Sequence, residues 1–331
     1  MLPDGYATLA TVLRDAGYDT GLFGKWHLGS SPQFGPNHFG FNTSYGSLAG
    51  GVDPYNHFYK RGEHSVTWHR NSTLIEDKGH VTDLIVREAA QWIESRQQPW
   101  FSYVPFTAVH VPIKPTSQWL ARYFHEDFDD DPARVLSYKK YAAYTSHMDW
   151  GIGQLLESLE RTGQRDNTIV VFTSDNGGLE DLPLHGTDQY PGWQEEYPRL
   201  GTNKPYRGVK AQLYEGGVRS PTVISWRGQI EAGATMADPV QIADWMPTLC
   251  HLAGAARVGD WKLIRRQPPN NQPAGQPSGG PERELFHITE DPYETQEVSA
   301  DYTDIVADLQ AFIDDQRQLD DTSKRADVDS R

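Results

Sequence analysis

The sequence is poor in the features that mark several common classes of protein. It has one cysteine, Cys250, among 331 residues, so no disulfide can form within the chain. None of its apolar runs approaches the roughly 18 residues that a membrane-spanning helix needs. Its first residues have neither the basic nor the apolar stretch of a signal peptide, so the sequence specifies no compartment. We therefore expect a fold held by an apolar core, without a membrane span.

Basic residues are scarce relative to acidic ones. The chain has 30 lysines and arginines against 45 aspartates and glutamates, which gives a formal net charge of −15 at pH 7. A nucleic-acid-binding protein needs a basic face, so this balance argues against nucleic acid as a partner. A small anionic substrate is still compatible with it, because a few lysines in a pocket can dominate the local field.

The chain does contain a regular alternation of helical and strand patterns. Helical spacing of apolar residues predicts helices at residues 9–16, 81–96, 138–159 and from about residue 244. Short apolar runs predict strands at residues 20–23, 100–106, 168–173 and 222–226. The run at 168–173 suits a parallel strand that is covered on both faces. The alternation predicts an α/β fold with a doubly wound, mostly parallel sheet.

Beyond residue 254 the pattern changes, which predicts a second, smaller part. Two strand-like segments, at 257–264 and 284–288, precede an amphipathic helical pattern at 304–315. We therefore predict an α/β domain at 1–254, a small antiparallel α+β subdomain at 255–315 with a mobile Pro/Gly-rich loop at 267–282, and a disordered acidic tail at 316–331.

Polar residues with catalytic chemistry directly follow the predicted strands. Lys25 and His27 come after the first strand, His110 after the second, and Asp175 and Asn176 after the third. Ligands of such α/β folds bind at the carboxyl ends of strands, so we expect these side chains at one site. Carboxylate and amide oxygens suit Ca²⁺ or Mg²⁺, and histidine exchanges protons near neutral pH.

Three segments resemble, in their order and spacing, the formylglycine-dependent sulfatases of the alkaline phosphatase superfamily. They are Gly-Lys-Trp-His-Leu-Gly at 24–29, Thr-Ser-Asp-Asn-Gly-Gly at 173–178, and Arg-Gly-Val-Lys at 207–210 followed by Glu-Gly-Gly-Val-Arg-Ser-Pro at 215–221. Segments 46–50 and 286–293 are most similar to the arylsulfatase B branch, an N-acetylgalactosamine-4-sulfatase. The resemblance implies an alkaline phosphatase-like fold that hydrolyses a sulfate ester of an aryl group or a sugar. The partner would be a sulfated small molecule or glycan, in a periplasmic, secreted or lysosomal setting.

The resemblance also implies a role for each polar residue. The Asp175-Asn176 pair would ligate Ca²⁺ or Mg²⁺ beside the formylglycine. Lys25 and His27 would contact the formylglycine hydrate, with His27 as a base that releases bound sulfate. His110 and Lys210 would bind the ester and assist the leaving group.

Two parts of the family pattern are not found before Lys25 in this sequence, as in an N-terminally truncated member. The Cys/Ser-x-Pro-Ser-Arg motif that yields formylglycine and an Asp-Asp pair that adds two metal carboxylates would both lie upstream of Lys25. Cys250 lies in an apolar helical segment and lacks this motif. We therefore expect weak metal binding and negligible turnover from this chain alone. The alternatives are a non-catalytic protein that binds sulfated glycan, and a phosphonate or phosphodiester hydrolase of the same superfamily.

Overall fold

The structure is a computed structural model. It describes residues 7–62, 65–179, 190, 201–236, 240–253, 255–258, 261–265, 283–287, 290–291, 296–311 and 314. Contacts divide the chain into two compact units. The first comprises Met1–Gly5 and Thr20–Met236, and the second comprises Tyr6–Asp19 and Ala237–Arg331.

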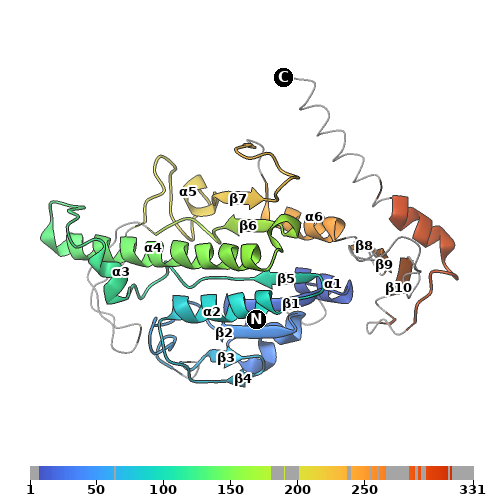
Figure 1. Ribbon diagram of the computed structural model, residues 1–331, viewed down its shortest axis with the longest axis horizontal. Helices are drawn as coiled ribbons and strands as arrows, with labels where there is room; N and C mark the ends of the chain where they lie inside the picture. Colours follow the sequence, from blue (N-terminus) through green and yellow to red (C-terminus); the bar gives the residue numbers. More distant parts are fainter. Residues whose placement is uncertain are drawn as a thin grey trace. The chain divides into compact units, whose positions relative to one another are not determined.

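The first unit is built on a five-stranded sheet with the order β4-β3-β2-β1-β5 (Figure 1). β1 (Asp19–Lys25), the second strand from one edge of this sheet, is buried except at its two end residues and pairs in parallel with β2 (Thr43–Ser47). β3 (Trp68–Arg70) and β4 (Thr73–Leu74) continue the sheet in antiparallel pairing. β5 (Trp100–Tyr103) forms the other edge.

Two long helices of the first unit, α2 (Val81–Glu94) and α4 (Pro132–Arg161), run alongside each other (Figure 1). α2 begins at His80, whose side chain accepts a hydrogen bond from Thr82 N. Its apolar face enters a core shared with the strands and with α4; the core includes Phe23, Tyr45, Trp68, Ile85, Ala89, Trp92 and Leu159. The short helix α3 (Ser117–Ala121) packs on α4. Single 3₁₀ turns lie at Pro32–Phe34, Pro36–Phe39 and Arg165–Asn167.

A two-stranded sheet and the helix α5 (Glu215–Val218) complete the described part of the first unit. β6 (Val170–Thr173) pairs antiparallel with β7 (Thr222–Ser225), with Val170 opposite Ser225. The prediction of a parallel strand covered on both faces is wrong for this run, because its partner among the described residues is antiparallel and most of its side chains are exposed. An apolar run indicates a strand but does not fix the direction of the partner.

The second unit contains helices and an antiparallel sheet. α1 (Leu9–Asp15), capped by Thr8, contacts α6 (Trp245–Leu252), which follows a 3₁₀ turn at Ile242–Asp244. β8 (Ala255–Val258), β9 (Trp261–Arg265) and β10 (Arg283–His287) form the sheet in the order β10-β9-β8. Residues 303–311 are helical, and Leu309 packs with Leu263 and Leu285.

The predicted 257–264 strand is in fact parts of two strands, since β8 and β9 pair antiparallel with Val258 opposite Trp261. Gly-Asp, the sequence between these two residues, is a common hairpin turn sequence. The predicted loop at 267–282 and tail at 316–331 lie outside the described residues. The predicted domain limits stay a prediction.

The predicted α/β class is confirmed, and the sheet is mixed, with the β1–β2 pair parallel and the β2–β3–β4 part antiparallel. Within the described ranges, no helix has the length and apolar character to cross a membrane.

Candidate functional site

Lys25 and His27 are placed by the end of β1. Lys25 is the last residue of the strand, and its backbone N donates to Pro105 O at 2.8 Å. The intervening Trp26 is buried, and its indole Nε1 donates to Phe34 O at 2.8 Å. His27 has a φ of 65°, a conformation that is uncommon for a residue with a side chain. The buried tryptophan therefore anchors the loop, and His27 leaves the strand through a sharp local turn.

Two consecutive glycines form a floor beneath His27 and His110. A Cβ atom on Gly50 would lie 2.9 Å from His27 Nε2, and one on Gly51 would collide with His110 Nδ1. The two imidazoles therefore lie over neighbouring residues of one segment. His110 Nδ1 is 2.7 Å from Val111 O, so this nitrogen carries the proton and Nε2 carries the lone pair.

The turn after β6 is held by a dense set of hydrogen bonds. Asn203 accepts from Gly178 N at 2.9 Å and donates to Gly178 O at 3.0 Å. Lys210 N donates to the same Gly178 carbonyl at 3.1 Å. These bonds bring the segment that carries Lys210 to the turn that carries Asp175.

The charges of the predicted residues act on one another, so these residues lie near one another in the first unit. Burial lowers the pKa of Lys25, while Asp175 opposes this shift and Lys210 adds to it. Burial also lowers the pKa of His110 to about 4, and Lys25 and Lys210 act in the same direction. The structure thus brings together Lys25, His110, Lys210 and Asp175.

His27 belongs to the same electrostatic group. Although this residue is largely exposed, partial burial of its ring and then the charges of Lys25 and Lys210 lower its pKa. Lys60 contributes a smaller effect in the same direction. Both site histidines are therefore neutral at pH 7 and can accept a proton.

The donor chemistry of Asp175 and Asn176 fits a hard cation. Asp175 is an exposed carboxylate, and Asn176 Nδ2 donates to Gly177 O at 2.9 Å, which leaves the amide oxygen of Asn176 as its ligand atom. Ca²⁺ takes six to eight oxygen ligands, so these two would supply only part of the shell.

Sequence reasoning missed several residues that shape this site. The packing of Gly50 and Gly51 against the two imidazoles depends on how distant loops meet. The same is true of Asn203, which joins two segments by hydrogen bonds, and of the nearby cation Lys60. The adjacent glycines were the only visible signal, because a Gly-Gly pair permits close approach of other groups. A separate cluster of His80, Asp83 and His147 was also missed.

Two lysines, two histidines and a carboxylate that lie near one another suit the binding of an anionic ester, because fixed positive charge stabilises the anion. The chain belongs to the sulfatase family, whose model matches residues 1–255. Its fold is that of the alkaline phosphatase superfamily, as the resemblance predicted.

Similar proteins and structures agree with this assignment. The chain is 26% identical over 319 residues to an arylsulfatase of Klebsiella aerogenes, covering 76% of this chain and 69% of that protein. It is 29% identical over 272 residues to the N-acetylgalactosamine-6-sulfatase of Mus musculus, covering 78% of this chain and 47% of that protein. The chain thus spans about half the length of this mammalian relative.

Among solved structures, Ps i-CgsB in complex with k-i-k-neocarrahexaose matches with a TM-score of 0.63 and 24% identity, over 95% of this chain and 74% of that chain. The PsFucS1 sulfatase from Pseudoalteromonas sp. matches with a TM-score of 0.57 and 20% identity, over 94% of this chain and 72% of that chain. At these identities the likeness establishes the fold.

Proposed function

We propose that the site around Lys25, His27, His110, Lys210 and Asp175 binds the sulfate group of a sulfate ester. The observation that carries this proposal is the placement of two neutral imidazoles over Gly50 and Gly51, within the field of two lysines. A sulfate monoester is a compact anion, and fixed cations in a partly buried site bind such a group more strongly than cations in water.

Each side chain has a role that its environment supports. Lys25 and Lys210 hold the sulfate oxygens. His110 keeps its proton on Nδ1 through Val111 O, so Nε2 is available to exchange a proton with the ester oxygen. His27 is neutral and serves as the base that assists release of sulfate. Asp175 and Asn176 would hold a Ca²⁺ or Mg²⁺ ion through their oxygens, and such a cation supplies charge neutralisation at the sulfate.

We propose a sulfated sugar, rather than a simple aryl sulfate, as the substrate class. Two relatives support this choice by name, an N-acetylgalactosamine-6-sulfatase and a structure in complex with its substrate D-glucosamine-2-N,6-O-disulfate. The exposure of His27 and the additional charge of Lys60 are compatible with a ligand larger than one sulfate group.

The 331-residue chain itself is proposed to bind the ester with negligible turnover. No segment of the sequence has the form Cys/Ser-x-Pro-Ser-Arg, and Cys250 is followed by His251 and is buried against Val12 in the second unit. The lysines and histidines of the proposed site are nevertheless all present in the chain, which favours sulfated-glycan binding as the activity of these residues alone.

The test is calorimetric binding of N-acetylgalactosamine-6-sulfate and of unsulfated N-acetylgalactosamine to the 331-residue protein, with release of sulfate measured in parallel. We expect the sulfated sugar to bind at least about tenfold more tightly, a difference of about 1.4 kcal/mol. Lys25→Ala and Lys210→Ala should each remove most of this preference. Lys78→Ala is the matched control, because Lys78 is an exposed lysine elsewhere in the unit. Equal affinity for the two sugars would refute sulfate recognition, and rapid sulfate release would refute the lack of turnover.

A further inference from the structure

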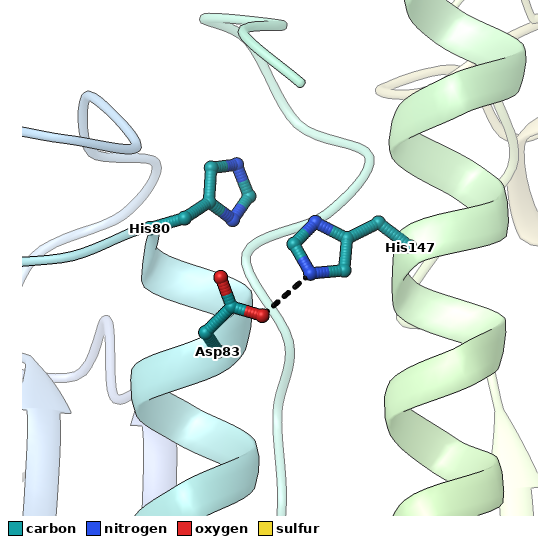
Figure 2. Close-up of side chains that lie close together, drawn as sticks. All are labelled: His80, Asp83 and His147. Atoms are coloured by element: carbon teal, nitrogen blue, oxygen red, sulfur yellow. Dashed lines mark hydrogen bonds and ion pairs between the residues drawn. The ribbon is translucent and has the colours of Figure 1, made fainter. Parts of the chain in front are cut away.

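Three side chains with metal-binding chemistry meet between α2 and α4, apart from the residues discussed above. Figure 2 shows His80 and Asp83 at the start of α2 and His147 on α4, with the carboxylate of Asp83 turned toward the His147 ring. His147 Nε2 is 2.8 Å from Asp83 Oδ1. One ligand atom from each of the three residues lies within 4.8 Å of the others. The helix packing therefore places two imidazoles and one carboxylate around a single point.

The two rings are fixed by their surroundings, whereas the carboxylate is open to solvent. The side chain of His147 is 1% exposed and that of Asp83 is 48% exposed. The His147 ring is stacked on Trp119, with centroids 5.2 Å apart, and on His80, with centroids 4.6 Å apart. A ligand can thus reach the cluster from the Asp83 side, and it meets imidazoles that need little rearrangement.

The hydrogen bonding of His80 leaves the correct nitrogen available. Its Nε2 is 3.1 Å from Lys114 O, so the proton resides on Nε2 and the lone pair on Nδ1. Nδ1 accepts only a long bond, 3.3 Å, from Thr82 N. A backbone carbonyl behind the remote nitrogen is the usual support of a metal-ligating histidine. Burial, followed by the neighbouring His147, lowers the pKa of His80 to about 4, so the ring is neutral at pH 7.

Hydrogen bonds among the described residues do not satisfy all the buried polar atoms in and around this cluster. His147 Nδ1 and Thr82 Oγ1 are both buried, and neither has a partner among the residues that the structure describes. Buried polar groups without partners cost free energy, and apolar side chains would fill the same space between two helices at lower cost. The convergence of two buried imidazoles on a solvent-exposed carboxylate therefore points to a ligand.

We propose that His80 Nδ1, His147 Nε2 and an Asp83 oxygen form a binding site for a borderline divalent transition metal ion such as Zn²⁺. Two imidazole nitrogens and one carboxylate match the preferences of Zn²⁺ and Co²⁺ and differ from the all-oxygen set that Ca²⁺ or Mg²⁺ requires. The ion takes the place of the proton between His147 and Asp83, and the ring proton moves to Nδ1 of His147. Water from the open side supplies the fourth ligand.

The experiment titrates Co²⁺ into the untagged, chelator-treated 331-residue protein and records the visible d–d absorption, with Zn²⁺ as a competitor. We expect one Co²⁺ per chain in a tetrahedral spectrum that Zn²⁺ displaces and excess Ca²⁺ does not. Asp83→Asn should weaken binding by at least about 100-fold, because it removes a charged ligand. Asp83 is exposed, so this variant should fold normally. His147→Gln should have the same effect if it folds.

Two control substitutions test whether Co²⁺ binds at the proposed site. Asp149→Asn alters another exposed carboxylate of α4 and should leave the titration unchanged. Asp175→Asn alters the proposed hard-cation ligand and should also leave it unchanged, which separates this site from the proposed sulfate site. Zn²⁺ should raise the urea midpoint of the wild-type protein but not that of Asp83→Asn, since it binds only the folded state. Absent d–d bands, or equal Co²⁺ affinity in wild type and Asp83→Asn, would overturn the proposal.

Discussion

At the residue scale, histidine burial sets much of the chemistry of the first unit. His69 is fully buried, with Nδ1 2.8 Å from Gly46 O and Nε2 3.0 Å from Ser44 Oγ. Burial lowers its pKa to about 4, the same direction as for His80 and His110. All three rings are uncharged at pH 7, so acid must charge groups that the folded protein keeps away from water.

The expected consequence is a loss of stability between about pH 6.5 and pH 4. The unfolded chain binds a proton at His69 near pH 6.5, whereas the folded protein binds it only near pH 4. The unfolded state therefore holds more protons in this interval, and the free energy of unfolding falls as pH falls. One such histidine contributes on the order of 3 kcal/mol, which is fully present above pH 6.5.

Urea denaturation at several pH values measures the slope of the free energy of unfolding against pH. His69→Asn should flatten the pH dependence relative to wild type, whatever its effect on stability at pH 7. His125→Gln, at an exposed histidine, should keep the wild-type slope. An unchanged slope in His69→Asn would show that His69 does not titrate differently in the two states.

The polar residues of the proposed site can be picked out in the sequence at this scale, but the residues that pack against them or tether them cannot. Lys25, His27 and Asp175 follow apolar runs, and the end of a strand is visible in the sequence. Gly50, which packs against the His27 ring, is some twenty residues further along the chain, and no sequence periodicity relates Gly50 to His27. His147 is another such case, because its partner Asp83 is on a different helix and only the packing of α2 on α4 joins them.

At the element scale, helices were predicted better than strand partners. The apolar spacing of α2 and α4 fixed their existence, although α4 begins at Pro132, several residues before the predicted start. A helix makes its hydrogen bonds locally, whereas a strand needs a partner that its own sequence does not specify. This is why β6 was predicted as a strand but its antiparallel pairing with β7 was not.

The approach of α2 to α4 depends on one glycine, which gives a matched pair of substitutions. A Cβ atom on Gly151 would lie 2.7 Å from Val86 Cγ2, whereas one on Gly153 would have no atom within 4 Å. Both glycines are within α4. Gly151→Ala should destabilise the protein by roughly 1–3 kcal/mol through overpacking, less the gain in helix propensity. Gly153→Ala should stabilise it by roughly 0.5–1 kcal/mol.

Thermal and urea unfolding of the two variants check this prediction. Both substitutions change the helix propensity equally, so the difference between them isolates the contact with Val86. If the two variants are equally stable, α2 and α4 can move apart around the added methyl group without a loss of stability. Gly151→Ala should also weaken Co²⁺ binding more than Gly153→Ala does, since it alters the spacing between the helices that carry Asp83 and His147.

At the scale of the whole molecule, Cys250 can report on the unfolding of the second unit, to which it belongs. The sequence pattern places this cysteine inside a predicted domain at 1–254, whereas the contacts place it in the second unit, where it packs with Val12. Its side chain is only 7% exposed, so a thiol reagent reaches it when this region opens. All but Trp245 and Trp261 of the ten tryptophans lie in the first unit, so intrinsic fluorescence reports mainly on that unit.

Labelling of Cys250 and tryptophan fluorescence should therefore follow different transitions in a urea titration. The second unit has small apolar clusters, such as that of Leu263, Leu285 and Leu309, and should open at a lower urea concentration than the larger core of α2, α4 and the sheet. Val12→Ala should lower the labelling midpoint further and leave the fluorescence midpoint in place, because it weakens the apolar cluster that buries Cys250 in the second unit. Coincident midpoints in both proteins would instead support the division at residue 254, with α6 unfolding together with the sulfate site.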